Sequence, residues 1–321
     1  MNNAPASCGA EGREVRRSNS PARTNSPLGC SARRGTAKQV PSGKLAADLS
    51  ALGSSTAEVA QPCVPAIELR EVSFSYGKEP FIGGLSAMFS HGAVTSIVGP
   101  NGCGKSTLAK LAMGLVKPTS GRVRIAGRDV SSLAARERAR LLGVLVQQQE
   151  APMMTVRELA ACGRFPHHGP LSRLDETDAQ CIDETLSLAG VYDLRDRPLR
   201  SLSGGQRQRA RMAMVLAQDT PVVLLDEPTS FMDAAACFDM MRLVRRVRER
   251  GKTVIAVIHD LNLALSVADA VFVMERGRLA AQGAPGEAAV QSAIEQSFGV
   301  RLEHVETPSG VAWVPFERED V

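Results

Sequence analysis

The segment GPNGCGKST, residues 99–107, has the residue types and spacing of a phosphate-binding loop. Its glycines allow successive backbone N–H groups to turn toward an anion, and the helix expected after it presents its positive N-terminus to the same point. Lys105 can reach the β- and γ-phosphates of a nucleotide, and the hydroxyl of Ser106 can bind magnesium. The predicted nucleotide-binding residues of this loop are Gly99, Pro100, Asn101, Gly102, Cys103, Gly104, Lys105, Ser106 and Thr107.

Three further polar side chains follow apolar runs that are typical of buried strands. Asp226 and Glu227 end VVLLDE, and His259 follows VIAVI. Ligands of open α/β sheets bind at the carboxyl ends of the strands, so we expect these side chains beside the phosphate-binding loop. There Asp226 can hold magnesium through its water shell, and Glu227 can accept a proton from an attacking water. A histidine after a strand is often structural, but in this company His259 can hydrogen-bond the γ-phosphate or the attacking water.

Two more residues complete the predicted site, each with a simpler alternative. Gln147 follows a short apolar segment, and its amide can coordinate magnesium or orient the attacking water without adding charge; the alternative is an ordinary polar loop. Tyr76 ends a strand-like segment, and its ring can stack on adenine or simply pack. The adjacent His167 and His168 are not assigned to a metal, because neighbouring side chains in a Pro/Gly-rich loop rarely converge on one ion.

The segment LSGGQRQRA, residues 202–210, indicates a second anion site. Ser203 and the N–H groups of Gly204 and Gly205 stand at the start of a predicted helix, where side chains take up little room. A chain that already holds a phosphate-binding loop does not need another for the same nucleotide. The phosphate-binding loop alone gives no reason for this second site.

The elements expected around these residues alternate between strand and helix. The predicted strands lie within 66–76, 84–99, 121–127, 221–226 and 252–260, the predicted helices within 105–115 and 237–250, and a C-terminal hairpin within 300–316. This order favours an α/β domain with a mainly parallel sheet. The mostly helical middle of the chain, from about residue 131 to 218, is predicted to be an insert.

Composition limits the class of protein. Residues 1–64 contain no aromatic side chain and hold eight Lys and Arg against four Asp and Glu, so we expect a disordered N-terminal extension without a secretory signal. Residues 65–321 hold thirty of each charge sign, which argues against nucleic acid as a partner. Seven scattered cysteines without a C-x-x-C pair argue against a disulfide framework and favour a reducing compartment.

The order of these motifs resembles that of the ABC ATPases over about residues 66–321. The resemblance implies a P-loop NTPase fold with a mainly parallel core sheet, an N-terminal antiparallel β-subdomain and an inserted helical subdomain at approximately 148–218. In that family two subunits sit head to tail, and the LSGGQ signature of one closes on the ATP held by the other. Asp233 would lie in the loop along the dimer seam. The signature residues, expected to contact the partner's ATP, are Leu202, Ser203, Gly204, Gly205 and Gln206.

Further segments, among them MTVRELAACGRFPHH and VIHDLNLALSVAD, are similar to the ATP-binding subunits of iron(III)-siderophore importers, a group that includes haem and cobalamin importers. This similarity implies an ATP hydrolase, with magnesium, that forms a homodimer on the cytoplasmic side of the inner membrane as a peripheral protein. Its partners would be transmembrane permease subunits and, indirectly, a solute-binding protein. We expect the permease contact between Gln147 and Arg164, with Met153 and Met154 as exposed anchors.

Alternatives from other classes fit less well. A haem or cobalamin importer would share every motif, because the ATPase does not touch the solute. A soluble ABC ATPase of translation or DNA repair usually carries two ATPase halves or a long coiled coil, and a small-molecule kinase or GTPase would leave LSGGQ without a role. One segment departs from the resemblance: AAACFD, residues 234–239, replaces the polar, often His-containing stretch that usually follows the dimer-seam Asp.

Overall fold

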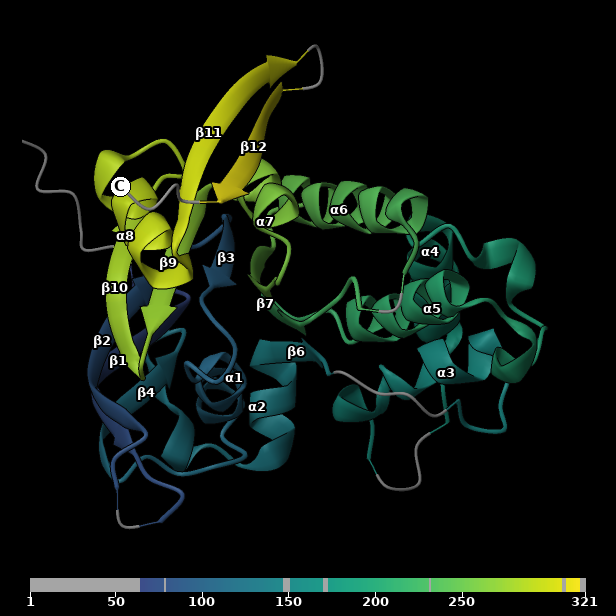
Figure 1. Ribbon diagram of the computed structural model, residues 1–321. Coiled ribbons are helices and arrows are strands. Elements are labelled where there is room, and N and C mark those ends of the chain that lie inside the picture. The colour runs from purple at the N-terminus through teal and green to yellow at the C-terminus, as the bar shows by residue number, and fades with distance from the viewer. Residues whose placement is uncertain are drawn as a thin grey trace, which may run out of the picture. The chain divides into compact units, whose positions relative to one another are not determined.

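Three sheets organise the described part of the protein (Figure 1). The computed structural model describes residues 64–77, 79–146, 151–169, 173–230, 232–307 and 310–317. All but the last residue of the predicted N-terminal extension lies outside this part, so the expected disorder stays a prediction.

A six-stranded sheet in the order β10-β9-β3-β8-β7-β6 forms the centre of the fold. Strands β9, β3, β8, β7 and β6 run parallel, and β10 pairs antiparallel at one edge. The two central strands β3 and β8 are buried along their whole length, as expected for a parallel sheet covered on both faces. The mainly parallel α/β core predicted from the sequence is confirmed. The strands are β3 (Val94–Val98), β6 (Leu142–Leu145), β7 (Val222–Asp226), β8 (Thr253–Val257), β9 (Ala270–Glu275) and β10 (Arg278–Gly283).

An antiparallel sheet in the order β2-β1-β4-β5 precedes most of this core in the sequence. Its apolar side chains and one face of the six-stranded sheet enclose helix α1 (Lys105–Ala112) in a buried cluster that includes Ile67, Phe89, Leu108 and Phe272. Burial on both sides fixes the direction of α1, so its N-terminus stays at the phosphate-binding loop. The strands are β1 (Ile67–Phe74), β2 (Ile82–Phe89), β4 (Ser120–Ile125) and β5 (Arg128–Asp129).

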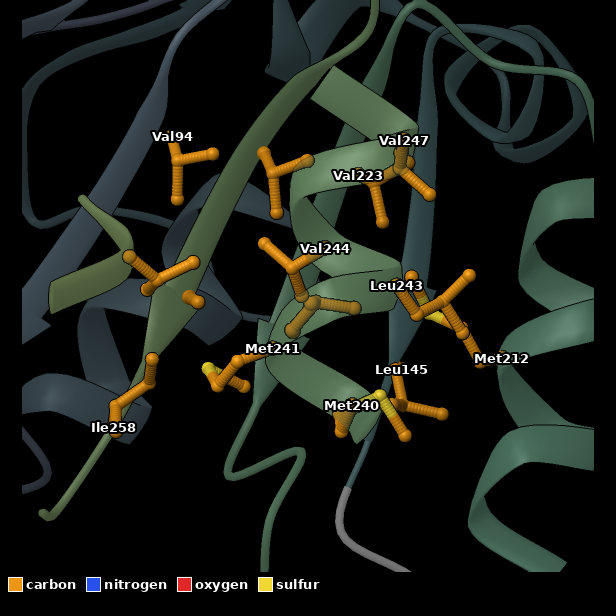
Figure 2. Packing of buried hydrophobic residues seen from close by; sticks show 14 of the residues in the cluster. Val94, Leu145, Met212, Val223, Met240, Met241, Leu243, Val244, Val247 and Ile258 are labelled. Carbon is orange, nitrogen blue, oxygen red and sulfur yellow. The ribbon is translucent and has the colours of Figure 1, made fainter. Parts of the chain in front are cut away.

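Helices α6 (Ala234–Glu249) and α7 (Leu261–Val267) contribute to the second buried cluster, which includes alternate residues of β7 such as Val223. The apolar face of α6 contributes Met240, Val244 and Val247, at helical spacing, to the cluster seen in Figure 2. Its charged side chains, among them Arg242, Arg245 and Arg248, are exposed on the other side of the helix. Strand β7 therefore has apolar neighbours on both faces, and polar groups can emerge only at its end.

In its described residues, the predicted helical insert contains three helices that pack on one another, α3 (Val156–Cys162), α4 (Glu176–Leu188) and α5 (Gly204–Ala217). The short 3-10 helices η2 (Phe165–His167), η3 (Tyr192–Leu194) and η4 (Leu199–Ser201) lie between them. The mostly helical segment expected from about residue 131 also contains β6, which belongs to the core sheet, after η1 (Val130–Ser132) and α2 (Ala135–Leu141). The boundaries 148–218 remain predictions.

The C-terminal part contains helix α8 (Ala288–Phe298) and the predicted hairpin, formed by β11 (Val300–Thr307) and β12 (Gly310–Glu317). Strand β12 packs on α7. Within the described ranges, the helices are all too short or too polar to cross a membrane.

Candidate functional site

The phosphate-binding loop connects β3 to α1 and is shaped by glycines. Gly104 has φ 111°, a conformation that favours glycine, and a Cβ there would lie 2.8 Å from Met274 Cε. A Cβ on Gly99 would overlap the backbone carbonyl of Met274. These two positions require glycine, and they leave a cradle whose walls are backbone. The cradle fits an anion that is bound by N–H groups.

Lys105 is placed inside this cradle. It is 6% exposed, and its Nζ donates hydrogen bonds to the carbonyl oxygens of Gly99, at 2.7 Å, and Pro100, at 3.0 Å. An ammonium group is thus held at the loop by two neutral acceptors, which a phosphate oxygen can replace with a charge-assisted bond. Cys103 is a buried filler between these groups, and its burial raises the pKa of the thiol.

Ser106 and Tyr76 lie at the exposed side of the loop. Ser106 is exposed, so its hydroxyl is open to a ligand. The Tyr76 hydroxyl lies 3.1 Å from Thr107 Oγ1, and its ring meets Phe74 edge to face with centroids 4.8 Å apart. The ring is nevertheless 62% exposed. The ring also meets Phe81 edge to face with centroids 5.6 Å apart, so Tyr76 packs within the protein and its stacking on adenine stays a prediction.

Asp226 ends β7, the strand next to β8 in the sheet. Its Oδ1 atom is buried and has no hydrogen-bond partner in the described part of the protein. Burial, and after it the like charge of Glu227, raises the pKa of Asp226. A buried carboxylate oxygen without a donor fits a site for a cation, since carboxylate oxygen is a preferred ligand of magnesium. Ser106 and Asp226 are the described residues that would hold this ion.

The surroundings of Glu227 favour its ionised form, unlike those of Asp226. Its Oε1 accepts a hydrogen bond from Nε2 of His259 at 2.5 Å, and its Oε2 accepts one from Oγ of Ser230 at 2.8 Å. Partial burial raises the pKa of Glu227, but the hydrogen bonds from His259 and Ser230 outweigh it and hold this pKa below its usual value. Glu227 is therefore ionised at neutral pH and ready to accept a proton. Its φ of 52° places it in the left-handed region, which costs about 1–2 kcal/mol for a residue with a side chain.

His259 lies beside Glu227 because β8, the strand that it follows, is the neighbour of β7. It follows β8, its side chain is 45% exposed, and its Nε2 is hydrogen-bonded to the Glu227 carboxylate. The same Nε2 cannot serve Glu227 and a γ-phosphate with two full hydrogen bonds. Contact with a phosphate therefore requires this bond to be shared or exchanged.

Ser230 also contacts Glu227, although it is not among the site residues predicted from the sequence. Its backbone N–H donates to the carbonyl of Glu227 at 3.2 Å, so a turn brings its hydroxyl back onto the carboxylate three residues earlier. Serine is a common turn residue, so the sequence could indicate a turn here but not the bond to the Glu227 carboxylate. Met274 of β9 packs against Gly99 and Gly104 of the phosphate-binding loop, and the sequence did not indicate this contact.

The signature loop, Leu202–Gln206, forms the start of α5. Ser203 Oγ accepts a hydrogen bond from the Gln206 N–H at 3.3 Å, and Gln206 Oε1 accepts one from the Ser203 N–H at 3.0 Å. This capping box satisfies two donors, whereas the N–H groups of Gly204 and Gly205 have no carbonyl within the helix to bond. Ser203 is exposed and Leu202 is buried, so the loop offers a hydroxyl and two N–H groups at its surface.

The surroundings of the two anion sites differ. A Cβ on Gly205 would meet Ala236 and Met232, whereas one on Gly104 would meet Met274, Phe81 and Ile82. Asp233, predicted at the dimer seam, is exposed and caps α6 by accepting the Ala236 N–H at 2.8 Å.

Gln147 lies outside the described residues. It comes two residues after the end of β6, which is the neighbour of β7, and its roles in magnesium coordination and catalysis stay predictions.

Met154, expected with Met153 to be an exposed anchor, is not exposed. It is partly buried and packs against the core, and its carbonyl accepts the Leu199 N–H at 3.0 Å, so its side chain is committed to the fold. Met153 is 85% exposed, as expected.

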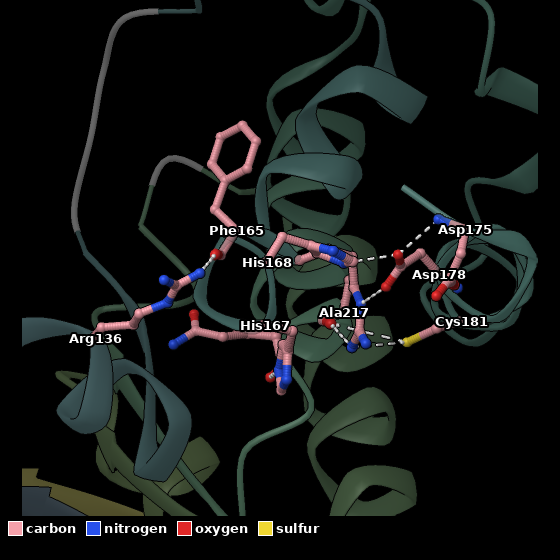
Figure 3. A network of polar contacts seen from close by, with 10 residues as sticks. Arg136, Phe165, His167, His168, Asp175, Asp178, Cys181 and Ala217 are labelled. Atoms are coloured by element: carbon pink, nitrogen blue, oxygen red, sulfur yellow. Dashed lines mark hydrogen bonds and ion pairs between the residues drawn. The ribbon is translucent and has the colours of Figure 1, made fainter. Parts of the chain in front are cut away.

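His167 and His168 do not converge on a metal site. His167 Nε2 lies 2.8 Å from the carbonyl of Gln218, and His168 Nε2 lies 2.7 Å from Oδ2 of Asp178 (Figure 3). Arg164 donates to the other oxygen of Asp178 at 2.8 Å. These side chains tie the turn after α3 to α4 and to the end of α5, so His167 and His168 have structural contacts here.

A glycine-lined loop between the central strand β3 and a buried helix, with carboxylates at the end of β7, one strand away across β8, defines a P-loop nucleoside triphosphatase. The family model for the ABC transporter matches residues 82–230. The chain is 39% identical over 240 residues to the ferric enterobactin transport ATP-binding protein FepC of Escherichia coli strain K12, covering 74% of this chain and 89% of FepC. It is 34% identical over 244 residues to the iron(3+)-hydroxamate import ATP-binding protein FhuC of Bacillus subtilis strain 168, covering 75% of this chain and 91% of FhuC.

The solved dimeric structure of a bacterial ABC transporter cassette matches with a TM-score of 0.61 and 28% identity, covering 69% of this chain and 99% of that one. The chain belongs to the ABC-transporter family, as an ATP-binding subunit that hydrolyses ATP.

Proposed function

We propose that this protein energises the import of an iron(III)-siderophore or a related metal chelate through a membrane permease. The relatives that transport ferric enterobactin and iron(3+)-hydroxamate support this substrate class. Haem and cobalamin import remain the alternative within the same group. The protein would lie peripherally on the cytoplasmic side of the inner membrane and receive its solute indirectly, through a binding protein and the permease.

The proposed hydrolysis uses residues at the carboxyl ends of the neighbouring strands β3, β8, β7 and β6, together with Tyr76, which follows β1 of the antiparallel sheet. Lys105 and the glycine-shaped N–H groups bind the phosphates, and Tyr76 stacks on the adenine. Glu227 accepts the proton of the attacking water, and His259 holds its carboxylate and contacts the γ-phosphate. A magnesium ion bound by Ser106, Asp226 and Gln147 would neutralise charge on the phosphates.

The second part of the proposal is a head-to-tail dimer, and the signature loop is the observation that carries it. Ser203, Gly204 and Gly205 form an anion site whose neighbours are not those of the phosphate-binding loop. Such a site has a use when a second copy presents its nucleotide to it. Asp233, exposed at the start of α6, would then lie along the seam between the copies.

The dimer is tested with the variant Glu227→Gln, which binds ATP but lacks the base. In gel filtration with ATP and magnesium it should elute as a dimer, and without nucleotide as a monomer. The double variant Glu227→Gln/Ser203→Arg is the control and should stay monomeric. A Glu227→Gln protein that stays monomeric with ATP would contradict the proposal.

The permease contact is proposed for the surface between Gln147 and Arg164. Met153 is the exposed apolar residue there, and Phe165, 67% exposed directly after this segment, extends the surface. Phe165 stands on a firmly held turn, because Arg136 donates to its carbonyl at 3.3 Å and Arg164 is paired with Asp178 (Figure 3). An exposed aromatic on a rigid support is a suitable anchor for a partner.

The solute itself is tested by growth. A deletion strain should lose growth on one class of ferric siderophore as the sole iron source and keep growth on free iron salts. Loss of growth on haem or of cobalamin uptake, with siderophore use intact, would favour the alternative.

A further inference from the structure

A groove of about 530 Å³ lies between helices α6 and α7 and the end of the C-terminal hairpin, where Thr307 pairs with Gly310. Helix α7 packs on both α6 and β12, so the three elements form the walls of one groove (Figure 1). The volume falls within the roughly 300–1,000 Å³ that is typical of small-ligand sites. The described residues that line the groove are not those of the ATP site or of the signature loop.

Hydrogen bonds between the walls hold the groove in shape. On the helix side, NH2 of Arg245 in α6 donates to the carbonyl of Ser266 in α7 at 2.6 Å. On the hairpin side, Oγ of Ser266 donates to the carbonyl of Val311 in β12 at 3.3 Å, and the Trp313 N–H donates to Oδ1 of Asn262 at 3.0 Å. Because α7 is bonded to both other walls, the groove is formed without a ligand, as most small-ligand sites are.

Most of the lining side chains are apolar. Met241, Leu263 and Val267 are buried, so they form the floor of the groove. Phe238 and Val311 also line it, but they are 54% and 42% exposed. Clustered apolar side chains that stay open to water are typical of binding sites. The groove therefore suits a ligand with an apolar body.

The charge of the groove is positive. Its ionisable lining residues are Arg242 and Arg245, and no carboxylate is found among the lining residues that the structure describes. Arg245 is bonded to a neutral carbonyl. The Arg242 side chain is 75% exposed and lies 3.3 Å from Oδ1 of Asp239, but the other oxygen of Asp239 is already paired with Arg209 at 3.0 Å. Guanidinium groups bind carboxylates through charge-assisted hydrogen bonds, so an anionic ligand is favoured.

We propose that this groove is a binding site for a small amphiphilic carboxylate. The apolar body lies on the floor formed by Met241, Leu263 and Val267, and the carboxylate binds at Arg242 and Arg245. Three walls around a volume of this size suit a small molecule better than a flat protein surface. The site does not depend on the transport function proposed above, because its lining residues take no part in binding or hydrolysing ATP.

The first test is isothermal titration of the full-length protein with octanoate, and with octanamide as the uncharged match. We expect octanoate to bind saturably, with a Kd at least about tenfold lower than that of octanamide, because the amide cannot form charge-assisted bonds. Trp313 is the only tryptophan of the chain and follows the lining residue Ala312, so its fluorescence should change with the same Kd. No binding of octanoate, or equal affinity for the two probes, would overturn the proposal.

The second test changes the charge of the groove. Arg242→Gln and Arg245→Gln should each raise the Kd for octanoate about tenfold, since each variant removes a charge-assisted bond. Arg246→Gln is the matched control, because Arg246 is exposed on the same helix but does not line the groove, and its Kd should stay within about twofold of wild type. Equal changes in all three variants would show a general charge effect and overturn the site.

A third variant keeps the test valid if Arg245→Gln, which loses the bond to Ser266, fails to fold. Val311→Glu places a negative charge at an exposed lining position and should raise the Kd for octanoate about tenfold or more, with an unchanged melting temperature. An unchanged Kd in this variant would contradict binding in the groove.

A second copy of the chain as the occupant gives a different result. The wild type would then self-associate with rising concentration in gel filtration without nucleotide, and Val311→Glu would stay monomeric. That outcome would overturn the small-ligand site. All of these measurements are made without ATP, so their failure leaves the ATP-dependent dimer and the transport function to their own tests.

Discussion

Replacing Asp226 by asparagine should stabilise the nucleotide-free protein. It should also abolish the additional stabilisation that magnesium gives to the ATP-bound protein. Oδ1 of Asp226 is buried without a donor in the described part of the protein, and such a group costs about 1–3 kcal/mol of folding free energy, more when it is charged. Asparagine keeps a polar atom there but removes the charge, so it relieves part of this cost. The raised pKa of Asp226 leads to the same expectation. The folded state disfavours the ionised carboxylate, so ionised Asp226 destabilises the fold at neutral pH. For a domain of this size, about 1 kcal/mol corresponds to a change in melting temperature of about 2–4 °C.

The adjacent carboxylate supplies a control of opposite sign. Glu227 is hydrogen-bonded by His259 and Ser230, and its pKa is lowered, so its ionised form stabilises the folded state at neutral pH. Glu227→Gln should lower the melting temperature of the nucleotide-free protein where Asp226→Asn raises it. As the pH falls below the raised pKa of Asp226, this carboxyl group becomes protonated in the wild type. The higher melting temperature expected for Asp226→Asn should then disappear.

The assay is differential scanning fluorimetry at neutral and acidic pH, with and without ATP and magnesium. At 100 times its Kd, a ligand stabilises the fold by about 2.7 kcal/mol, so wild type and Glu227→Gln should both gain several degrees with ATP and magnesium. Asp226→Asn should gain no more with magnesium than with ATP and a chelator. A nucleotide-free Asp226→Asn protein that melts below wild type, or one that keeps the full magnesium-dependent gain, would refute this account of the site.

Three further variants test the remaining roles. Ser203→Arg should abolish hydrolysis while the Kd for ATP measured by titration stays near wild type; hydrolysis at the wild-type rate would contradict a role for the signature loop in the partner's site. His259→Ala should lower kcat by about 100-fold or more with little change in ATP affinity, because Glu227 loses a donor and the phosphate a contact, and an unchanged kcat would exclude both. Met153→Glu should uncouple ATP hydrolysis from the permease in reconstituted membranes without changing the basal rate of the isolated subunit, and normal coupling would move the contact elsewhere.

The order of the strands explains what could be predicted from the sequence. Asp226 and His259 each follow an apolar run, and parallel strands bring their carboxyl ends to one edge, so their approach to the phosphate-binding loop follows from pattern alone. The 2.5 Å bond between His259 and Glu227 does not follow from the pattern. It depends on β7 and β8 being neighbours, and on the left-handed backbone of Glu227, neither of which leaves a periodic signal.

Long-range packing accounts for the error at Met154 and for the features that were missed. Two adjacent methionines before a helix give no indication of which one faces inward, and tertiary contact with the core buries Met154 while Met153 stays exposed. Ala236 is similar: the sequence marks it only as a departure, and its neighbour Gly205 is 31 positions earlier. Contacts of this kind are set by the crossing of two helices, which no local pattern encodes.

The two anion sites also differ in how ready they are for a ligand. In the signature loop, Ser203 and Gln206 already bond each other's backbone N–H, so the loop keeps its shape without a nucleotide and exposes the N–H groups that an anion needs. In the phosphate-binding loop, Lys105 is bonded to the carbonyls of Gly99 and Pro100 and has to exchange these acceptors for phosphate oxygens. In the dimer proposed above, ATP at the phosphate-binding loop would therefore require a local exchange of acceptors at Lys105, whereas the partner's signature loop would close on it without changing shape.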